Sequence, residues 1–281
     1  MIFVSSSCIK SKFIKESVIA LHNLGFINIE LSGGTTFYNG MVEDLLELKE
    51  KYNLKFLCHN YFPPPQKDFV LNLSSLKPTV YQQSYQHIID SLQLCEHIGA
   101  EKYAFHAGFF MDPDVSELGK RFKLADINDS TKAQNKFCSA YKDIISHKAQ
   151  VKIYIENNVL SHSNYLTYNL NPFMLTNLAD HNELKQKLEF NLLLDIAHLK
   201  VTCTTLKLNF TNEFRQLFRS TDYIHLSDND GLHDLNHGIK DNSELANLLK
   251  EEDLKGKTFT LEIYDGPRSL VDSYQLLKKM I

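Results

Sequence analysis

Six short apolar segments of this 281-residue chain each end in a side chain that can bind a metal ion or move a proton. A His, Asp or Glu in such a position costs free energy unless it is solvated, paired or coordinated. If the six ends converge, they can hold a divalent cation and carry acid–base chemistry on a bound substrate. The six residues are His59, His106, Glu156, Asp195, His225 and Glu262.

Glu156, Asp195, His225 and Glu262 are the ligand set that the residue types favour. Three carboxylates and one imidazole suit a hard or borderline divalent ion such as Mn, Mg, Co or Zn. Each residue taken singly is explained as well by a solvated strand end, but four in the same register favour one shared site. His198 follows Asp195 by three positions and can turn back over this site, although a histidine at a helix start is an equal alternative.

The segment after His225 is unusually rich in further candidate ligands. A turn explains its Asn-Asp-Gly portion, but it explains the histidines less well. The candidates in this segment are Asp228, Asp230, His233, Asp234 and His237.

The elements that must position these residues alternate between strand-like and helix-like segments. Strands are predicted over residues 2–7, 26–32, 55–60, 102–108, 152–157, 190–198, 222–227 and 258–264. Helices are predicted over residues 9–24, 40–52, 79–99, 130–149, 172–182, 212–219, 243–251 and 268–280. Eight such units predict an α/β fold, a (β/α)8 TIM barrel with residues 1–281 as a single domain. The absence of a glycine-rich motif after the first strand disfavours the alternative, an open doubly wound sheet.

Side-chain alternation supports the barrel and one shared site. With the six strand-end residues pointing inward, the outward positions are apolar, as strands beneath a layer of helices require. Barrel enzymes keep their active sites at the carboxyl ends of the strands. Residues 109–129 and 157–171 follow strands, so we predict that they lie over this end as lids or substrate loops. The outward positions are Ile153, Ile155, Leu192, Leu194, Ile224, Leu226, Phe259, Leu261 and Ile263.

Composition narrows the partners and the location. The net charge of −4 argues against nucleic acid as a partner. A local basic cleft could still bind nucleic acid on a chain with this net charge. The sequence has neither an apolar run of 18 residues nor a signal-peptide pattern, so we expect no membrane span. Five scattered cysteines without a CxxC pair predict reduced thiols and a cytoplasmic location. A homo-oligomer is compatible with the sequence.

Five of these segments resemble the xylose-isomerase-like barrel superfamily, and the resemblance covers essentially the full length. This superfamily contains sugar isomerases, sugar and sugar-phosphate epimerases, and the endonuclease IV type of abasic-site nuclease. The segments that carry the resemblance are Phe105–Gly108, Ile155–Asn157, Leu194–His198, His225–Gly231 and Leu261–Ile263.

The resemblance to the epimerases implies one metal ion on the four favoured ligands, with Glu156 and Glu262 as the acid–base pair on opposite faces of a sugar. The metal would stabilise an enediolate, and His59, His106 and His198 would bind the substrate. This predicts a metal-dependent isomerase or epimerase of a small sugar, sugar phosphate or related hydroxy-carbonyl compound. These epimerases carry an arginine near the position of Gly231, so their sugar specificity is not implied here.

The resemblance to endonuclease IV implies the alternative, a zinc-dependent hydrolase of abasic DNA with a multinuclear site. The usual Asp-x-His is here Asp234-Leu-Asn236, and His237 comes one position later. A barrel that binds a ligand without turnover is a third possibility. The additional metal ligands in the hydrolase would be His59, His106, His198, Asp234 and His237.

Arg268 follows the last predicted strand at a helix start, where backbone N–H groups attract anions. We predict that it contacts a phosphate or carboxylate of the substrate. An ordinary surface arginine at a helix start is the alternative.

Overall fold

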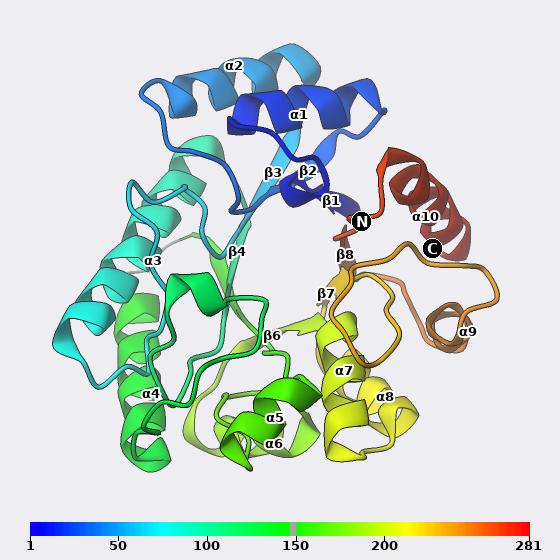
Figure 1. Ribbon diagram of the computed structural model, residues 1–281. Helices are drawn as coiled ribbons and strands as arrows, with labels where there is room; N and C mark the ends of the chain where they lie inside the picture. The colour runs from blue at the N-terminus through cyan, green and yellow to red at the C-terminus, as the bar shows by residue number, and fades with distance from the viewer. Residues whose placement is uncertain (147–149) are drawn as a thin grey trace.

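The computed structural model describes residues 1–146 and 150–281, which form a closed barrel of parallel strands surrounded by helices (Figure 1). Each strand pairs with the next along the chain, and β1 pairs with β8 to close the ring. The predicted (β/α)8 barrel is confirmed, and the alternative of an open sheet is wrong. The strands are β1 (Ile2–Ser5), β2 (Asn28–Leu31), β3 (Lys55–His59), β4 (Lys102–His106), β5 (Lys152–Glu156), β6 (Asn191–Asp195), β7 (Tyr223–Leu226) and β8 (Thr258–Leu261).

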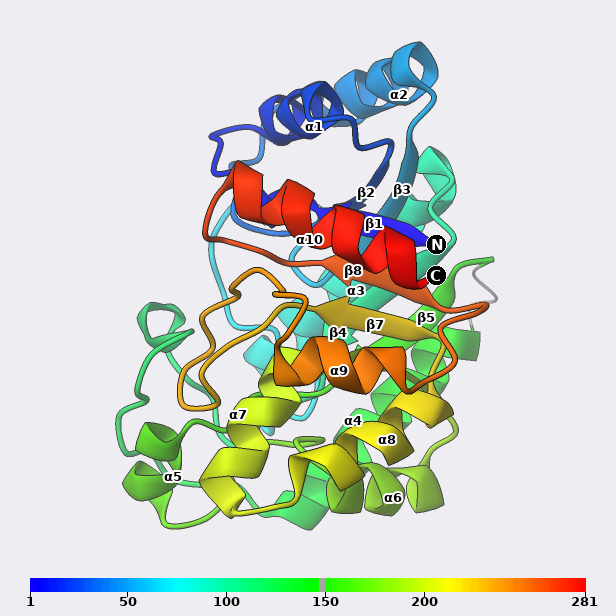
Figure 2. The same cartoon turned by 90° about the vertical axis from the view of Figure 1, so that its right-hand side faces the viewer.

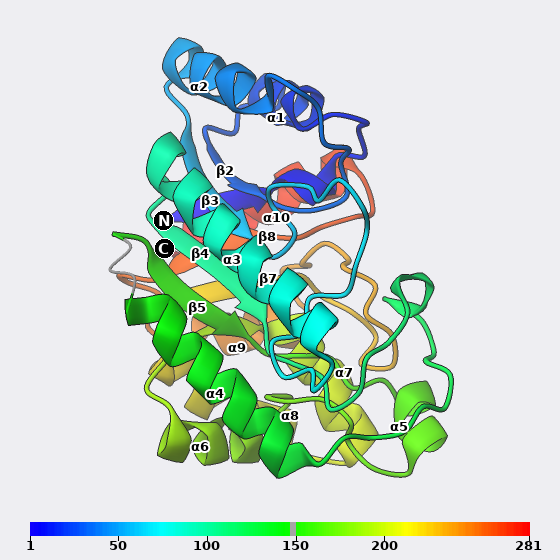
Figure 3. The same ribbon diagram turned by 90° about the vertical axis from the view of Figure 1, so that its left-hand side faces the viewer.

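The longer helices lie outside the ring, and the two chain termini lie close together (Figures 1 and 3). In the part of the chain that the structure describes, no helix combines the length and the apolar character needed to cross a membrane. The helices are α1 (Ile14–Asn23), α2 (Met41–Tyr52), α3 (Pro78–Ile98), α4 (Ser130–Ser146), α5 (His162–Tyr168), α6 (Leu178–Lys187), α7 (Ile196–Leu206), α8 (Phe210–Ser220), α9 (Glu244–Lys250) and α10 (Pro267–Met280).

Several predicted boundaries shift in the structure: the strand predicted over 2–7 ends at Ser5, and the helix predicted over 9–24 begins at Ile14. The largest differences lie in three segments. The strand predicted over residues 190–198 ends at Asp195, because the Asp195 side chain accepts the His198 N–H at 2.8 Å and caps α7. The helix predicted over 172–182 starts only at Leu178, after Asn177 caps α6. Part of the segment predicted as a loop over 157–171 forms α5. The end of the helix predicted over 130–149 lies outside the described residues.

The predicted alternation of inward and outward side chains is confirmed. Every predicted outward residue belongs to the apolar core between barrel and helices. A second hydrophobic cluster fills the barrel interior, so packed side chains and not a pore lie below the polar residues at the strand ends. This inner cluster contains Phe3, Leu57, Ala104, Tyr154, Leu193 and Tyr223.

The loops after β4, β5 and β7 gather at the carboxyl end of the barrel, beside α5 (Figure 2). Phe109 and Phe173 form an isolated antiparallel bridge that joins the first two loops. The Asn158 side chain donates to the backbone carbonyls of Ala107, Gly108 and Met174 at 2.8–3.2 Å. The loops after β4 and β5 are therefore fixed to one another. They share an apolar cluster with Val70 of the loop after β3, and its members are Val70, Phe109, Met111, Phe122, Leu160, Tyr168 and Phe173.

Candidate metal centre

The six strand-end residues converge at the carboxyl end of the barrel. Strand register brings His106 opposite Glu156 on the neighbouring strand, and Asp195 opposite His225. In the register of β3 and β4, His59 lies opposite Ala104, two residues before His106, and its side chain reaches Glu156 at 2.7 Å. Glu262 directly follows β8.

Glu156 is the centre of this cluster and is 1% exposed. Its Oε2 atom lies 2.7 Å from Nε2 of His59 and 3.1 Å from Nδ1 of His106. Its Oε1 atom lies 3.2 Å from Nδ1 of His225. One carboxylate on β5 therefore faces three imidazoles from three other strands.

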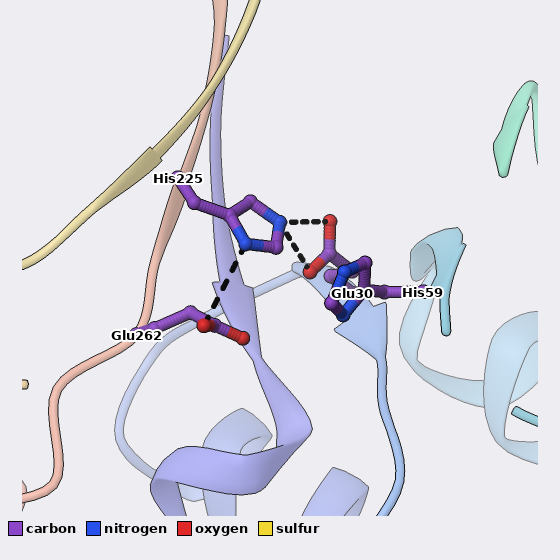
Figure 4. A group of neighbouring side chains, drawn as sticks. All are labelled: Glu30, His59, His225 and Glu262. Atoms are coloured by element: carbon purple, nitrogen blue, oxygen red, sulfur yellow. Dashed lines mark hydrogen bonds and ion pairs between the residues drawn. The ribbon is translucent and has the colours of Figure 1, made fainter. Parts of the chain in front are cut away.

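His225 is surrounded by carboxylates on both sides of its ring (Figure 4). Its Nδ1 atom lies 3.6 Å from Glu262, and its Nε2 atom lies 2.9 Å from Glu30. Glu30 was not predicted from the sequence, although a signal was present. Glu30 lies between the buried apolar residues Ile29 and Leu31, so alternation turns it inward.

His198 and Asp195 form a second corner of the site with Asp234. The His198 Nε2 atom lies 3.2 Å from Asp234 and 3.9 Å from Asp195. Its Nδ1 atom lies 3.0 Å from the backbone oxygen of Asn157, whose side chain also bonds both backbone polar groups of Asp195. Asn157 therefore fixes the position of β6 and the orientation of the His198 ring.

Three residues singled out in the sequence lie away from this cluster. Asn236 is buried, and its backbone oxygen accepts the N–H of Tyr264. The His237 side chain is 51% exposed and lies 3.6 Å from Asp265. The Arg268 side chain is 97% exposed and contacts Asp272 on its own helix at 3.9 Å. The substrate contact predicted for Arg268 stays a prediction.

The electrostatics around Glu156 keep the glutamates ionised. Burial alone would raise the pKa of Glu156, but the imidazoles of His106, His59 and His225 outweigh burial and hold this pKa well below its usual range. Burial would also raise the pKa of Glu262, but His225 beside it lowers this pKa to about 2. Both carboxylates therefore carry charge at neutral pH.

The histidines divide into two kinds. Burial would lower the pKa of His225, but Glu30, Glu262 and Glu156 raise it well above its usual value. In contrast, burial dominates at His106 and lowers its pKa to about 4. The buried carboxylates are therefore balanced by the protonated imidazole of His225, whereas His106 is neutral at neutral pH.

Burial and neighbouring charges also oppose each other at His198 and Asp195. Burial would lower the pKa of His198, but Asp195 and Asp234 raise it well above its usual value. Burial raises the pKa of Asp195 to about 7, against the opposing effect of His198.

The donor atoms fit a divalent metal ion. Three groups have ligand atoms within 4.8 Å of one another: Glu30, His59, His225 and Glu262; His59, His106 and Glu156; and Glu156, Asp195 and His198. The predicted set of Glu156, Asp195, His225 and Glu262 is divided between two of these groups. Within the described residues, four buried atoms of the cluster have no hydrogen-bond partner: Glu30 Oε1, His106 Nδ1, Glu156 Oε1 and His225 Nδ1. Buried polar atoms in this state are satisfied when a cation binds.

A cleft of about 950 Å³ opens beside these donors. His106, His198 and Asp234 contribute to its wall. The two predicted loop segments, 109–129 and 157–171, supply much of the rest, including Lys120 and Arg121 at the rim. The volume is in the range of about 300–1,000 Å³ typical of small-molecule sites.

Solved structures with the same architecture include sugar epimerases and a nuclease. The chain is similar to a D-tagatose 3-epimerase-like protein, with a TM-score of 0.74 and 17% identity over 99% of this chain and 96% of that one. It is similar to the 3-keto-D-glucoside 4-epimerase YcjR from E. coli, with a TM-score of 0.67 and 12% identity over 99% of this chain and 98% of that one. It is also similar to endonuclease IV from Thermus thermophilus, with a TM-score of 0.62 and 15% identity over 99% of each chain. At these identities the likeness shows the fold.

A search of curated protein sequences gave no match. The sequence profile of the family described as xylose isomerase-like TIM barrel matches residues 18–280, nearly the whole chain. The chain therefore belongs to the xylose isomerase-like TIM barrel family.

Proposed function

We propose that this protein is a divalent-metal-dependent isomerase or epimerase of a small sugar, sugar phosphate or related hydroxy-carbonyl compound. The observation that carries the proposal is the position of two ionised glutamates beside one imidazole. Nδ1 of His225 lies 3.2 Å from Glu156 and 3.6 Å from Glu262. The two glutamates come from β5 and from the end of β8, so they reach this point from different parts of the ring. Such a pair can remove a proton from one face of a substrate and return one to the other.

In this proposal Glu156, Asp195, His225 and Glu262 bind the metal ion. When bound, the ion would supply Lewis-acid polarisation of substrate oxygens. The donor set suits Mn, Mg, Co or Zn.

The two glutamates would act as weak but well-placed bases. Their low pKa values keep them ionised at neutral pH. A fixed position near the reacting carbon offsets weak basicity, because proximity removes much of the entropic cost of the reaction. His106 and His198 line the cleft, and in this proposal they bind substrate hydroxyls together with His59. The epimerase names of two similar structures support a sugar as the substrate class.

A zinc-dependent phosphodiester hydrolase of the endonuclease IV kind is the second candidate. The observation that favours it is that Glu156 belongs to two further donor groups, one with His59 and His106 and one with Asp195 and His198. The position of His237 counts against it, because this side chain is 51% exposed and lies 3.6 Å from Asp265, which belongs to none of the three donor groups in the described residues.

Metal content and isotope exchange separate the two candidates. The purified protein would be loaded with Mn²⁺ or Zn²⁺ and its metal content measured by elemental analysis. It would then be incubated in D₂O with a panel of free and phosphorylated ketoses and aldoses, and separately with abasic-site DNA. The first proposal expects about one ion per chain and deuterium at a carbon-bound position of a sugar product. Several ions per chain with DNA cleavage, and no exchange into any sugar, would replace it with the second.

Glu262→Gln tests the role of the second glutamate. The variant should lose deuterium exchange, because an amide cannot accept the proton. Glu189→Gln is the matched control, since Glu189 is exposed and precedes β6 at the opposite end of the barrel. Full turnover by Glu262→Gln would remove this residue from the acid–base pair.

A further inference from the structure

Glu30 is a fully buried carboxylate within the barrel whose contacts are all to protein donors. It is the inward-facing residue of β2 and is 0% exposed. Its Oε1 atom lies 2.9 Å from Nε2 of His225. Its Oε2 atom accepts from the Thr260 hydroxyl at 3.0 Å and from the Tyr223 hydroxyl. The carboxylate is therefore held in one orientation by donors from β7 and β8.

The two ring nitrogens of His225 serve different partners. Nε2 faces Glu30, whereas Nδ1 faces Glu262 across the ring (Figure 4). Glu156 also lies on the Nδ1 side, at 3.2 Å. A neutral imidazole carries a hydrogen on one nitrogen and a lone pair on the other. A hydrogen on Nε2 that is donated to Glu30 leaves the Nδ1 lone pair directed at the two glutamates of the candidate metal centre.

We propose that Glu30 is a positioning residue that fixes the tautomer and the ring orientation of His225 for metal binding. The inference rests on the proposed function, because it requires His225 to be a metal ligand. A carboxylate that accepts the second N–H of a metal-bound histidine raises the basicity of the ligand and sets its direction. The Thr260 and Tyr223 hydroxyls have a supporting part, since an isolated buried carboxylate would be strongly unfavourable.

The competing interpretation makes Glu30 a ligand itself, since its oxygens lie within 4.8 Å of donor atoms of His59, His225 and Glu262. Its existing contacts argue against this. Its Oε2 atom already accepts from Thr260, Tyr223 and His225, and its Oε1 atom lies 2.9 Å from Nε2 of His225. To make way for a cation beside Glu30, this nitrogen would have to give up its hydrogen. A positioning carboxylate keeps all of these contacts when the ion binds.

The test is the affinity of the metal-free protein for Mn²⁺ and Zn²⁺, measured by calorimetry in wild type and two variants. Glu30→Gln keeps the shape and an acceptor oxygen, so we expect binding about 10-fold weaker than in wild type. Glu30→Met fills a similar space without an acceptor, so we expect a loss of about 100-fold, the upper part of the range for such partners. Asp180→Asn is the matched control, because Asp180 is a partly buried, hydrogen-bonded carboxylate on α6. Its metal affinity should equal that of wild type.

A second readout separates positioning from a purely structural role. In the Zn²⁺-loaded protein, NMR of ¹⁵N-labelled histidine should show a protected Nε2–H on His225 in wild type and in Glu30→Gln. The signal should be lost in Glu30→Met. A structural role would lower the melting temperature of the variants without moving either the tautomer signal or the affinity, and that result would overturn the inference.

The remaining outcomes are also decisive. A wild-type protein that binds neither ion removes the proposed function and the inference together. A wild type that binds metal, with both variants binding equally well, removes the inference alone. A Glu30→Gln variant that no longer binds the ion at all, instead of binding it about 10-fold more weakly, would show that Glu30 is a ligand. If Glu30→Met does not fold, Glu30→Gln and its affinity carry the test.

Discussion

Replacing Glu156 by glutamine should destabilise the metal-free protein, because three imidazoles face this carboxylate, and those of His59 and His225 are buried. Its oxygens lie 2.7 Å from His59, 3.1 Å from His106 and 3.2 Å from His225. Removing one partner from a buried ion pair typically costs about 3–5 kcal/mol. The unfolding entropy of a 281-residue chain is about 0.6 kcal/mol/K. The melting temperature should therefore fall by about 5–8 °C.

The pKa shifts define the pH window of this loss. The pKa of Glu156 lies well below the ordinary 4.5. The contribution of its charge to the free energy of unfolding is therefore fully present above pH 4.5 and is lost as the pH falls through the folded-state pKa. The pKa values of His59 and His225 are raised above 6.5, so their contribution is fully present below pH 6.5 and is lost as the pH rises through their folded pKa values. The difference in melting temperature between wild type and Glu156→Gln should therefore be largest between pH 4.5 and pH 6.5.

Thermal and urea denaturation with EDTA at pH 6 would measure the gap. Glu189→Gln provides the control, since Glu189 is exposed and pairs with Lys185 at 2.8 Å. Exposed pairs contribute little, so the control should melt with wild type. A fall of less than about 2 °C for Glu156→Gln would refute the reasoning, because this is the effect of about 1 kcal/mol. So would a gap that widens as the pH is lowered to 3.

Three further predictions concern the same end of the barrel. Binding of Zn²⁺ at pH 7 should release protons, because the surrounding carboxylates outweigh burial and raise the pKa of His225, so the ion displaces a proton from the ring; equal calorimetric heats in buffers of different ionisation enthalpy would contradict this. His198→Ala should lower kcat/KM by about tenfold or more, since it removes a buried donor that lines the cleft, whereas the half-exposed His237→Ala should leave turnover within about twofold; equal losses in the two variants would contradict this ranking. Gly108→Ala should lower the melting temperature by about 2–5 °C, because an added Cβ would meet the side chain of Ser74; an unchanged melting curve would show that the loop can shift.

The strands could be predicted because their alternation is dictated by burial on two sides. Ile153 and Ile155 must face the helices, which leaves Glu156 facing the barrel interior. Helix α7 was not predicted, because its local sequence preference disagrees with the structure that it adopts. Its sequence carries Val201, Thr202 and further β-branched residues, whose restricted χ1 angles favour strands, and burial against the barrel overrides that preference.

The convergence of the strand ends could be predicted, but the pairing of individual side chains could not. Alternation assigns a residue to the interior without setting its distance from residues on other strands. Glu30 was missed because it lies one residue before the end of β2 with no further candidate ligand after it. His225 has the same place in β7, but the segment that follows it is rich in candidate ligands. The division of the predicted ligand set between two donor groups follows from side-chain directions that only the closed barrel determines.

The balance of charges within the cluster explains how the barrel can fold before a metal binds. Three histidines have raised pKa values because buried carboxylates lie beside them, so protons occupy the cluster when metal is absent: His59, His198 and His225. Small zinc domains unfold without their ion because the metal supplies most of their folding free energy. Here an extensive apolar core surrounds the barrel independently of the cluster. In the proposed metal site an ion would therefore exchange with protons in a folded protein, and variants at Glu156 and Glu30 can be compared in their metal-free state.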